Sequence, residues 1–272
     1  MPIRVGISTA ALAAALAFSS NLPAQTAPSS AEAKPRQPGL MAGGIPDLSG
    51  TWDADFKGAE GTRVNTWDSS DPFAKHPEQA PMTPWAAEKF KDVRPPFGAL
   101  QTFDNTNDPV QRFCDPPGVP RIYMYPWEMK FIQTPKAVYI LYEYTKVWRE
   151  IDLDREHPKD PDNSWMGDSI GKYEGDTFII DTIGFNDKTW LDQTGHPHSE
   201  ALHVIERFRR LDHDRLELSV TIDDPKAYTK NFSNTKVLRL TTAPMGETLC
   251  AYSEMKEFQE KVVDKTQTPP GK

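Results

Sequence analysis

The second half of the chain consists of short, strand-like segments that follow one another at close intervals. Between residues 215 and 223, Leu216, Leu218, Val220 and Ile222 alternate with polar residues, which is the pattern of a strand with one face in water. Sequences typical of tight turns separate such segments: Thr134-Pro135-Lys136, Glu174-Gly175-Asp176 and Asp212-His213-Asp214. Strands joined this closely favour an antiparallel meander.

We therefore predict a mainly β fold. A turn at Pro46–Gly50 precedes a strand that carries Trp52. Further strands are expected at Lys130–Thr134, Ala137–Tyr144, Val147–Leu153, Asp168–Tyr173, Thr177–Ile183, Leu202–Leu211, Arg215–Asp223, Thr235–Thr241 and Glu247–Tyr252. A meander has to remove its exposed edges, so we expect a closed, lipocalin-like barrel of roughly eight or more strands, with a two-sheet sandwich as the alternative.

One of these strands is ambiguous from sequence alone. In the segment Ser199–Leu211, the residues Leu202, Ile205 and Phe208 also have the spacing of a helix face. We predict a strand, because the segment runs directly into a tight turn and the alternating segment after it, so a hairpin explains both halves.

The first half of the chain is irregular and rich in proline. Its one good helix signal is short, with Thr83 as N-cap, Pro84 at the first position, and Trp85–Lys91 after it. The 25 prolines and low hydropathy indicate many loops, whereas 7 Trp, 8 Tyr and 13 Phe require a packed interior and argue against disorder.

The N-terminus has the three parts of a secretory signal: a basic start with Arg4, an apolar run over Val5–Phe18, and a small residue at the exit. We expect residues 1–24 to be a signal peptide cleaved near Ala24, with Ala27 as the alternative site and an uncleaved anchor as the alternative interpretation. Residues 25–44 read as a flexible leader, 45–255 as a single barrel-like domain and 256–272 as a C-terminal tail. The predicted location is the periplasm or the medium.

Two further features restrict the partners and the redox chemistry. Cys114 and Cys250 are the only cysteines, and in an oxidising compartment they either form one disulfide or remain as two separately buried thiols. They are too far apart in sequence for a cysteine-based zinc site. The formal net charge of −8 without a basic run makes nucleic acid an unexpected partner, and we expect no membrane insertion.

Several motifs together resemble a large family of secreted bacterial proteins with no established activity. They are Pro46-Asp47-Leu48-Ser49-Gly50-x-Trp52, the segments Cys114–Arg121, Trp165–Gly171, Glu174–Thr177 and Asp181–Asp187, and Gly195–Glu200. The first is also similar to the Gly-x-Trp opening strand of lipocalin-like (calycin) barrels. The resemblance covers most of residues 46–253. It implies export and a barrel, and it assigns no catalytic residue.

Histidines and acids are concentrated between residues 185 and 206. The cluster comprises Asn186, Asp187, Trp190, Asp192, His196, His198, Glu200, His203 and Glu206. General acid–base catalysis needs a group that titrates near neutrality beside a carboxylate that orients it. We expect His198 to carry the proton. Asp192 or Asp187 would orient its imidazole, and Glu200 would act as a second acid or base.

Other residues are candidates for ligand contacts. Trp165 and Trp190 are expected to form apolar walls for a flat substrate, and Asn186 and Arg207 to bind its polar groups. If the extended segment begins before His198, the side chains of His198, Glu200 and Glu206 share the face of the buried residues, and His203 lies on the opposite face with Arg207. If it is helical, Glu200, His203 and Glu206 align instead.

Three functions remain open at this point. The first is an exported enzyme that acts on a small apolar or aromatic molecule by His/carboxylate acid–base chemistry, as a lyase, isomerase or hydrolase. The second is a non-catalytic, lipocalin-like binder of a hydrophobic small molecule. The third is a metal-dependent enzyme in which His196 and His198 chelate a divalent metal. The sequence requires no cofactor, and a polar loop with structural histidines would explain the same residues.

Overall fold

The computed structural model of the protein describes residues 39–41, 43–54, 80–94, 106–258 and 261. The predicted signal peptide, the leader up to residue 38 and most of the predicted tail lie outside the described residues. None of the helices in the described part of the chain has the length and apolar character needed to cross a bilayer.

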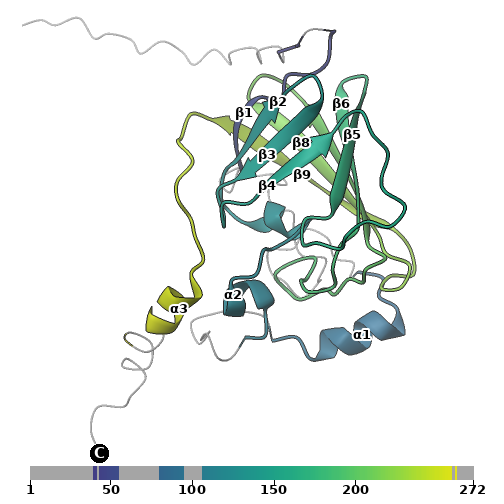
Figure 1. Ribbon diagram of the computed structural model, residues 1–272, viewed down its shortest axis with the longest axis vertical. Coiled ribbons are helices and arrows are strands. Elements are labelled where there is room, and N and C mark those ends of the chain that lie inside the picture. The colour runs from purple at the N-terminus through teal and green to yellow at the C-terminus, as the bar shows by residue number, and fades with distance from the viewer. Residues whose placement is uncertain (1–38, 42, 55–79, 95–105, 259–260, 262–272) are drawn as a thin grey trace, which may run out of the picture. The chain divides into compact units, whose positions relative to one another are not determined.

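Nine strands form a closed barrel in which sequence neighbours pair all the way round (Figure 1). The strands are β1 (Gly50–Ala54), β2 (Met129–Gln133), β3 (Ala137–Tyr142), β4 (Trp148–Asp152), β5 (Asp168–Glu174), β6 (Thr177–Ile183), β7 (His203–Arg210), β8 (Arg215–Asp223) and β9 (Phe232–Thr241). All pairs are antiparallel except β4–β5, which meet in parallel at Asp152 and Ile170. Pairing of β9 with β1 removes both edges, which confirms the predicted mainly β barrel over the sandwich.

One predicted strand is wrong. The segment Glu247–Tyr252 makes only an isolated bridge between Thr248 and Tyr144, and a helix, α3 (Tyr252–Phe258), begins where the strand was expected to end. The reason is that β9 already closes on β1, so no barrel edge is left for another strand to join.

Three helical elements accompany the barrel besides α3. The predicted helix is confirmed as α1 (Pro84–Lys91), with Thr83 Oγ1 accepting a hydrogen bond from the Ala86 amide. The helix α2 (Pro109–Phe113) and the 3₁₀ turn η1 (Arg121–Met124) were not predicted. The predicted disulfide is present: Cys114, at the end of α2, is bonded to Cys250, with their Cα atoms 5.3 Å apart.

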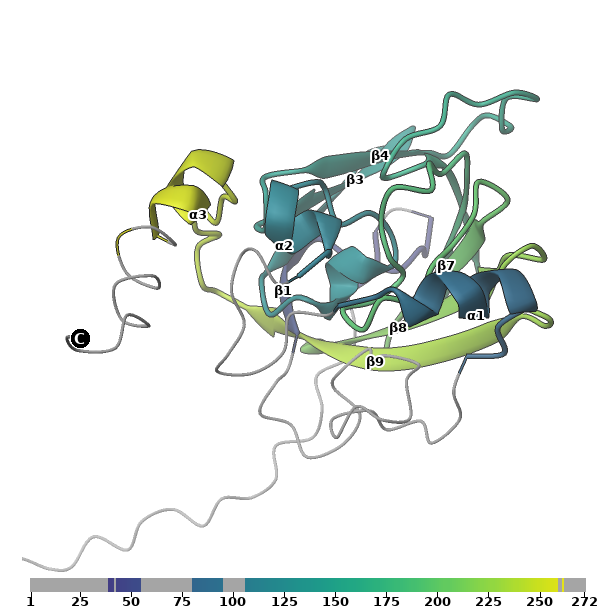
Figure 2. The same ribbon diagram turned by 90° about the horizontal axis from the view of Figure 1, so that it is seen from below.

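The two ends of the barrel differ in their connections. One end carries the tight turns after β2, β5 and β7. The other end carries the longer β6–β7 and β8–β9 connections and the chain that leads into β2, and we call it the loop end. Figures 1 and 2 show α1 and α2 at this end. Backbone hydrogen bonds hold α1 there, because the Thr83 amide donates to the Ala227 oxygen in the β8–β9 connection.

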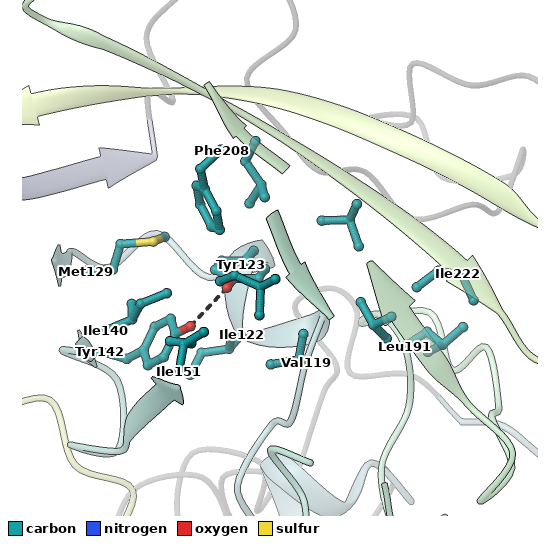
Figure 3. Close-up of a cluster of buried hydrophobic side chains, with 14 of the residues drawn as sticks. Val119, Ile122, Tyr123, Met129, Ile140, Tyr142, Ile151, Leu191, Phe208 and Ile222 are labelled. Atoms are coloured by element: carbon teal, nitrogen blue, oxygen red, sulfur yellow. Dashed lines mark hydrogen bonds between the residues drawn. The ribbon is translucent and has the colours of Figure 1, made fainter. Parts of the chain in front are cut away.

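The barrel interior is packed with side chains. Strand β7 is extended and alternates as expected, with Val204, Glu206 and Phe208 buried and Arg207 exposed. We call the segment Val119–Tyr123 the plug, because its residues Val119, Ile122 and Tyr123 pack into the hydrophobic core at the loop end (Figure 3).

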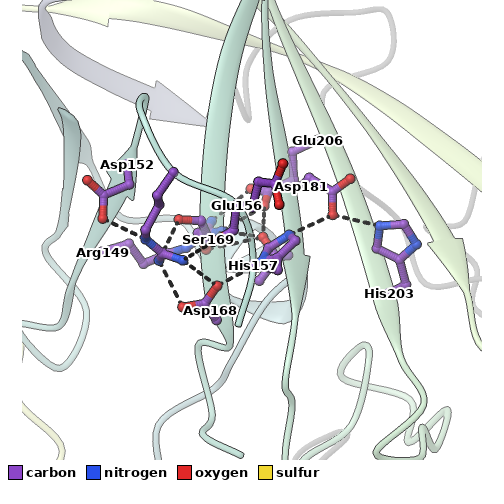
Figure 4. A network of polar contacts seen from close by, with 11 residues as sticks. Arg149, Asp152, Glu156, His157, Asp168, Ser169, Asp181, His203 and Glu206 are labelled. Carbon is purple, nitrogen blue, oxygen red and sulfur yellow. Dashed lines mark hydrogen bonds and ion pairs between the residues drawn. The ribbon is translucent and has the colours of Figure 1, made fainter. Parts of the chain in front are cut away.

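A buried ionic network ties the plug to the barrel wall. Arg149 makes two hydrogen bonds of 2.8 Å to the two carboxylate oxygens of Glu206. Arg149 also donates to Ser169 Oγ at 2.8 Å and to Thr182 Oγ1 at 3.0 Å (Figure 4). The Tyr123 hydroxyl, from the plug, donates to Glu206 and lies 3.0 Å from the Tyr142 hydroxyl. The charges of Arg149 and Glu206 therefore face each other inside the core.

Lys236 is a further ionisable residue inside the barrel, besides Arg149 and Glu206, with 1% of its surface exposed. Its Nζ donates a 2.6 Å hydrogen bond to the backbone oxygen of Tyr123 in the plug. Burial lowers the pKa of Lys236 to about 7, although Asp53 opposes the shift. An unfolded lysine titrates near pH ~10.4, so between these values the unfolded chain binds more protons than the folded protein.

This difference predicts that Lys236 costs stability at low pH and that the cost is relieved as the pH rises. Between about pH 7.5 and 9.5, the wild type should gain roughly 2–3 kcal/mol of unfolding free energy relative to Lys236→Met. Urea unfolding of both proteins at the two pH values measures this gain. Identical pH dependence in the two proteins would contradict a depressed pKa for Lys236.

Candidate functional site

The loop between β6 and β7 builds most of the candidate site. Within it, Trp190 bridges to Pro197, and the Leu191 amide donates to the His196 oxygen at 2.8 Å. Asp192 Oδ1 accepts hydrogen bonds from the amides of Thr194, Gly195 and His196, at 3.0, 3.0 and 3.2 Å. An Asp side chain that accepts hydrogen bonds from the backbone amides after it commonly stabilises a tight turn, so Asp192 stabilises the conformation of this loop.

A pocket of about 230 Å³ lies between this loop and the end of α1. It is lined by Lys89, Asp92, Val93, Asn107, Asp187, Lys188, Thr189, Trp190, Gly195, Pro197 and His198. Gly195 has φ +100°, and a Cβ there would collide with Val93. The loop and the residues after α1 therefore pack closely only because this position lacks a side chain.

His198 is the histidine that lines this pocket. Its side chain is buried, and its Nδ1 lies 3.2 Å from the backbone oxygen of Ser199. A carbonyl only accepts, so Nδ1 carries the proton and Nε2 has the free lone pair. Burial lowers the pKa of His198, although the Ser199 oxygen, Asp224 and Asp187 oppose the shift. The imidazole is therefore neutral at neutral pH, and the hydrogen bond at Nδ1 is the one that His198 makes to the described residues through its ring.

Asp224 holds the backbone that positions His198. Its carboxylate accepts from the Ser199 amide at 2.6 Å and from the Ser199 hydroxyl at 2.8 Å. It also accepts from the amides of Lys226 and Ala227, so it joins the β8–β9 connection to the β6–β7 loop. Asp224 was not predicted as a site residue, although the Asp224-Pro225 turn after β8 is a local signal for it.

Asp192 does not orient His198, contrary to the first of the two expected pairings. Its Oδ2 lies 2.6 Å from His196 Nδ1, and both side chains are fully buried. Burial alone would raise the pKa of Asp192, but His196 and the turn hydrogen bonds lower it to about 2. Phe90, at the end of α1, stacks on the His196 ring at 4.8 Å, and His196 Nε2 is buried without a partner.

The structure separates the remaining predicted residues. Asp187 and Trp190 line the pocket with His198, whereas Glu200 is exposed just before β7. Asn186 is buried and accepts from the Lys188 amide at 3.2 Å. Arg207 lies on the outer face of β7, and Trp165 lines a different hollow.

The pocket also has lining residues that were not predicted. Local sequence patterns could not reveal them, because they are distant in sequence from the β6–β7 loop. They are Lys89, Asp92, Val93 and Asn107.

A second group of histidines and acids lies on the outside of the barrel (Figure 4). His157 Nδ1 is 2.7 Å from Asp168, and its Nε2 is 3.1 Å from Asp181. Asp181 Oδ1 also lies 2.8 Å from His203 Nε2, within hydrogen-bond distance. His203 thus lies away from the pocket, as the extended reading of β7 predicted.

The sequence suggested that His196 and His198 chelate a divalent metal. Each imidazole uses its Nδ1 for a protein partner, as metal-binding histidines usually do, so a metal would have to bind through the Nε2 atoms. Among the described residues, no group of three or more His, Cys, Asp or Glu side chains is placed to hold a metal ion.

Comparisons of the chain with protein-family models, with curated proteins and with solved structures found no match.

Proposed function

We propose that the protein is an enzyme that transfers a proton to or from a small molecule, with His198 as the general base. The molecule binds in the pocket between the β6–β7 loop and the end of α1, which we call the His198 pocket. The observation that carries the proposal is the state of His198. It is a buried, neutral imidazole whose Nδ1–H is held by a carbonyl and whose Nε2 carries the lone pair, in a residue that lines a pocket. A general base needs a free lone pair at the working pH and a fixed orientation.

The pocket lining indicates the kind of substrate. Two lysines, Lys89 and Lys188, and two acids, Asp92 and Asp187, lie around it, with Trp190 as an aromatic wall. This lining favours a molecule with polar groups over the mostly apolar substrate expected from the sequence. A lysine ammonium would also stabilise the negative charge that develops when His198 removes a proton. Isomerisation and elimination begin with such a step, and hydration, the reverse of elimination, returns the proton to carbon.

The alternative of a lipocalin-like binder is less well supported. That function requires a ligand inside the barrel, where Trp52, Phe131, Phe178 and Phe208 are fully buried and the Arg149–Glu206 pair occupies the core. We therefore place the ligand at the loop end. Export remains a prediction that rests on residues 1–24.

The experiment uses hydrogen–deuterium exchange of small carbon acids, because it detects proton removal without knowledge of the product. A panel of oxo, hydroxy and unsaturated acids in D₂O is followed by proton NMR. The wild type should accelerate exchange of at least one member, and His198→Ala should lower this rate by about 10²–10⁴-fold. The control is His213→Ala, because His213 lies in the turn between β7 and β8, at the opposite end of the barrel.

Nitrogen-15 NMR of the imidazoles provides a readout independent of substrate. His198 should be the neutral, Nδ1-protonated tautomer at about pH 6.5, where an ordinary histidine is half protonated. A charged His198 at this pH, equal exchange rates in wild type and His198→Ala, or a panel with no accelerated member would each contradict the proposal. Melting temperatures of both variants show whether a loss of rate reflects a loss of folding.

A further inference from the structure

A second hollow of about 370 Å³ lies beside the first, and we call it the aromatic groove. It is lined by Pro116, Lys146, Val147, Trp148, Ser164, Trp165 and Met166. Three separate segments contribute: the chain before the plug, the β3–β4 turn and the connection that precedes β5.

The two tryptophans of the groove differ in what they offer a ligand. Trp148 is 60% exposed, so its ring is accessible from solvent. The indole nitrogen of Trp165 is buried and has no acceptor. A buried N–H without a partner costs free energy, so a ligand oxygen that reached this nitrogen from the groove would gain a hydrogen bond.

The groove and the His198 pocket adjoin where Lys188 contacts Trp165. Lys188 Nζ lies 5.3 Å from the centre of the Trp165 ring, in a cation–π contact. Lys188 lines the His198 pocket, whereas Trp165 lines the groove. A molecule that reaches past Lys188 would therefore contact both hollows.

The charge of the groove favours an anion. Lys146 is the only charged residue among those that line it, and its ammonium donates to the Gly246 oxygen with other N–H bonds to spare. Lys188 adds a second positive charge beside Trp165. Asp115, next to Pro116, partly offsets Lys188: burial raises the pKa of Asp115 and Lys188 lowers it.

We propose that the aromatic groove binds the ring of an aromatic carboxylate, with Trp148, Trp165 and Met166 around the ring. The Trp165 N–H donates to an oxygen of the ligand, and Lys146 and Lys188 attract its negative charge. We place the reacting end of the same molecule past Lys188, in the His198 pocket. This point alone rests on the proposed function. Ring binding itself does not depend on His198.

Benzoate is the probe, with acetate as the ligand without a ring and benzyl alcohol as the ligand without a charge. Titrations are followed through the tryptophan indole N–H signals in ¹H–¹⁵N spectra. Benzoate should shift the signals of Trp148 and Trp165, moving Trp165 downfield, and should bind about tenfold or more tightly than either control ligand.

Two variants and two controls test the assignment of the site. Trp165→Phe keeps an aromatic ring but removes the donor, and should weaken benzoate binding about 5- to 10-fold. Trp148→Ala should weaken it at least as much. Trp85→Phe, in α1, and His198→Ala should leave it unchanged. Unshifted Trp148 and Trp165 signals at saturating benzoate, or unchanged affinity in Trp165→Phe, would overturn the proposal.

The experiments can contradict either proposal without contradicting the other. If benzoate binds as expected but no acid undergoes His198-dependent exchange, the groove is a binding site and the proposed function is wrong. If exchange depends on His198 while benzoate leaves Trp148 and Trp165 unaffected, the proposed function survives and the aromatic substrate class is wrong. If both hold, aromatic members of the panel should exchange faster than aliphatic ones.

Discussion

Replacing Glu206 with Ala should lower the free energy of unfolding by about 3–5 kcal/mol, one of the two largest effects we expect from the described structure. The substitution leaves the Arg149 guanidinium inside the barrel without its counter-charge, and both side chains of the pair are almost fully buried. It also removes the acceptor of the Tyr123 hydroxyl, so the plug loses a contact with the barrel wall. Urea unfolding at neutral pH measures the loss.

The matched control is Glu217→Ala on the outside of the same sheet. Glu217 pairs with Arg209 between β7 and β8, but both side chains are partly exposed. Water and ions screen such a pair, so the expected loss is below about 1 kcal/mol. Glu206→Gln adds a second comparison, because it keeps the shape and one acceptor oxygen but removes the charge. If Glu206→Ala costs no more than Glu217→Ala, the buried pair does not stabilise this core.

Removing the disulfide by the double substitution Cys114→Ser/Cys250→Ser should lower the free energy of unfolding by about 3–5 kcal/mol. The bridge joins residues 136 positions apart and encloses strands β2 to β9. It therefore restricts the unfolded chain strongly, since the entropy lost on closing a loop grows with the length of the loop. Changing both residues avoids leaving a reactive thiol behind.

The double variant should still form the barrel, because β9 pairs with β1 through Thr241 and Leu240, before Cys250 is reached. Amide NMR signals of the strands test this, and urea unfolding gives the stability. Reduction of the wild type with a thiol reagent should reproduce the same loss. An unchanged unfolding midpoint after complete reduction would mean that the bridge contributes nothing to stability.

In the candidate site, the sequence predicted which loop builds the pocket but not which acid pairs with which histidine. The cluster at residues 185–206 pointed to the correct loop, and His198, Asp187 and Trp190 do line one pocket. The pairing of the acids was not predictable. Asp192 is six residues from His198 and four from His196, and the turn that Asp192 itself stabilises presents it to His196. Sequence proximity does not distinguish these outcomes, because the direction of a side chain in a loop depends on the backbone of each residue.

Local sequence patterns determined the nine barrel strands, most turns and the capped start of α1, because period-2 alternation and turn chemistry act over a few residues. They also determined which residues of β7 point inwards, including Glu206. The tertiary structure alone decided that β9 closes on β1, that Arg149 meets Glu206 across the core, and that the end of α1 completes the His198 pocket. These contacts join residues far apart in sequence. They form only when the closed barrel brings its strands and loop end together, and no short-range pattern encodes them.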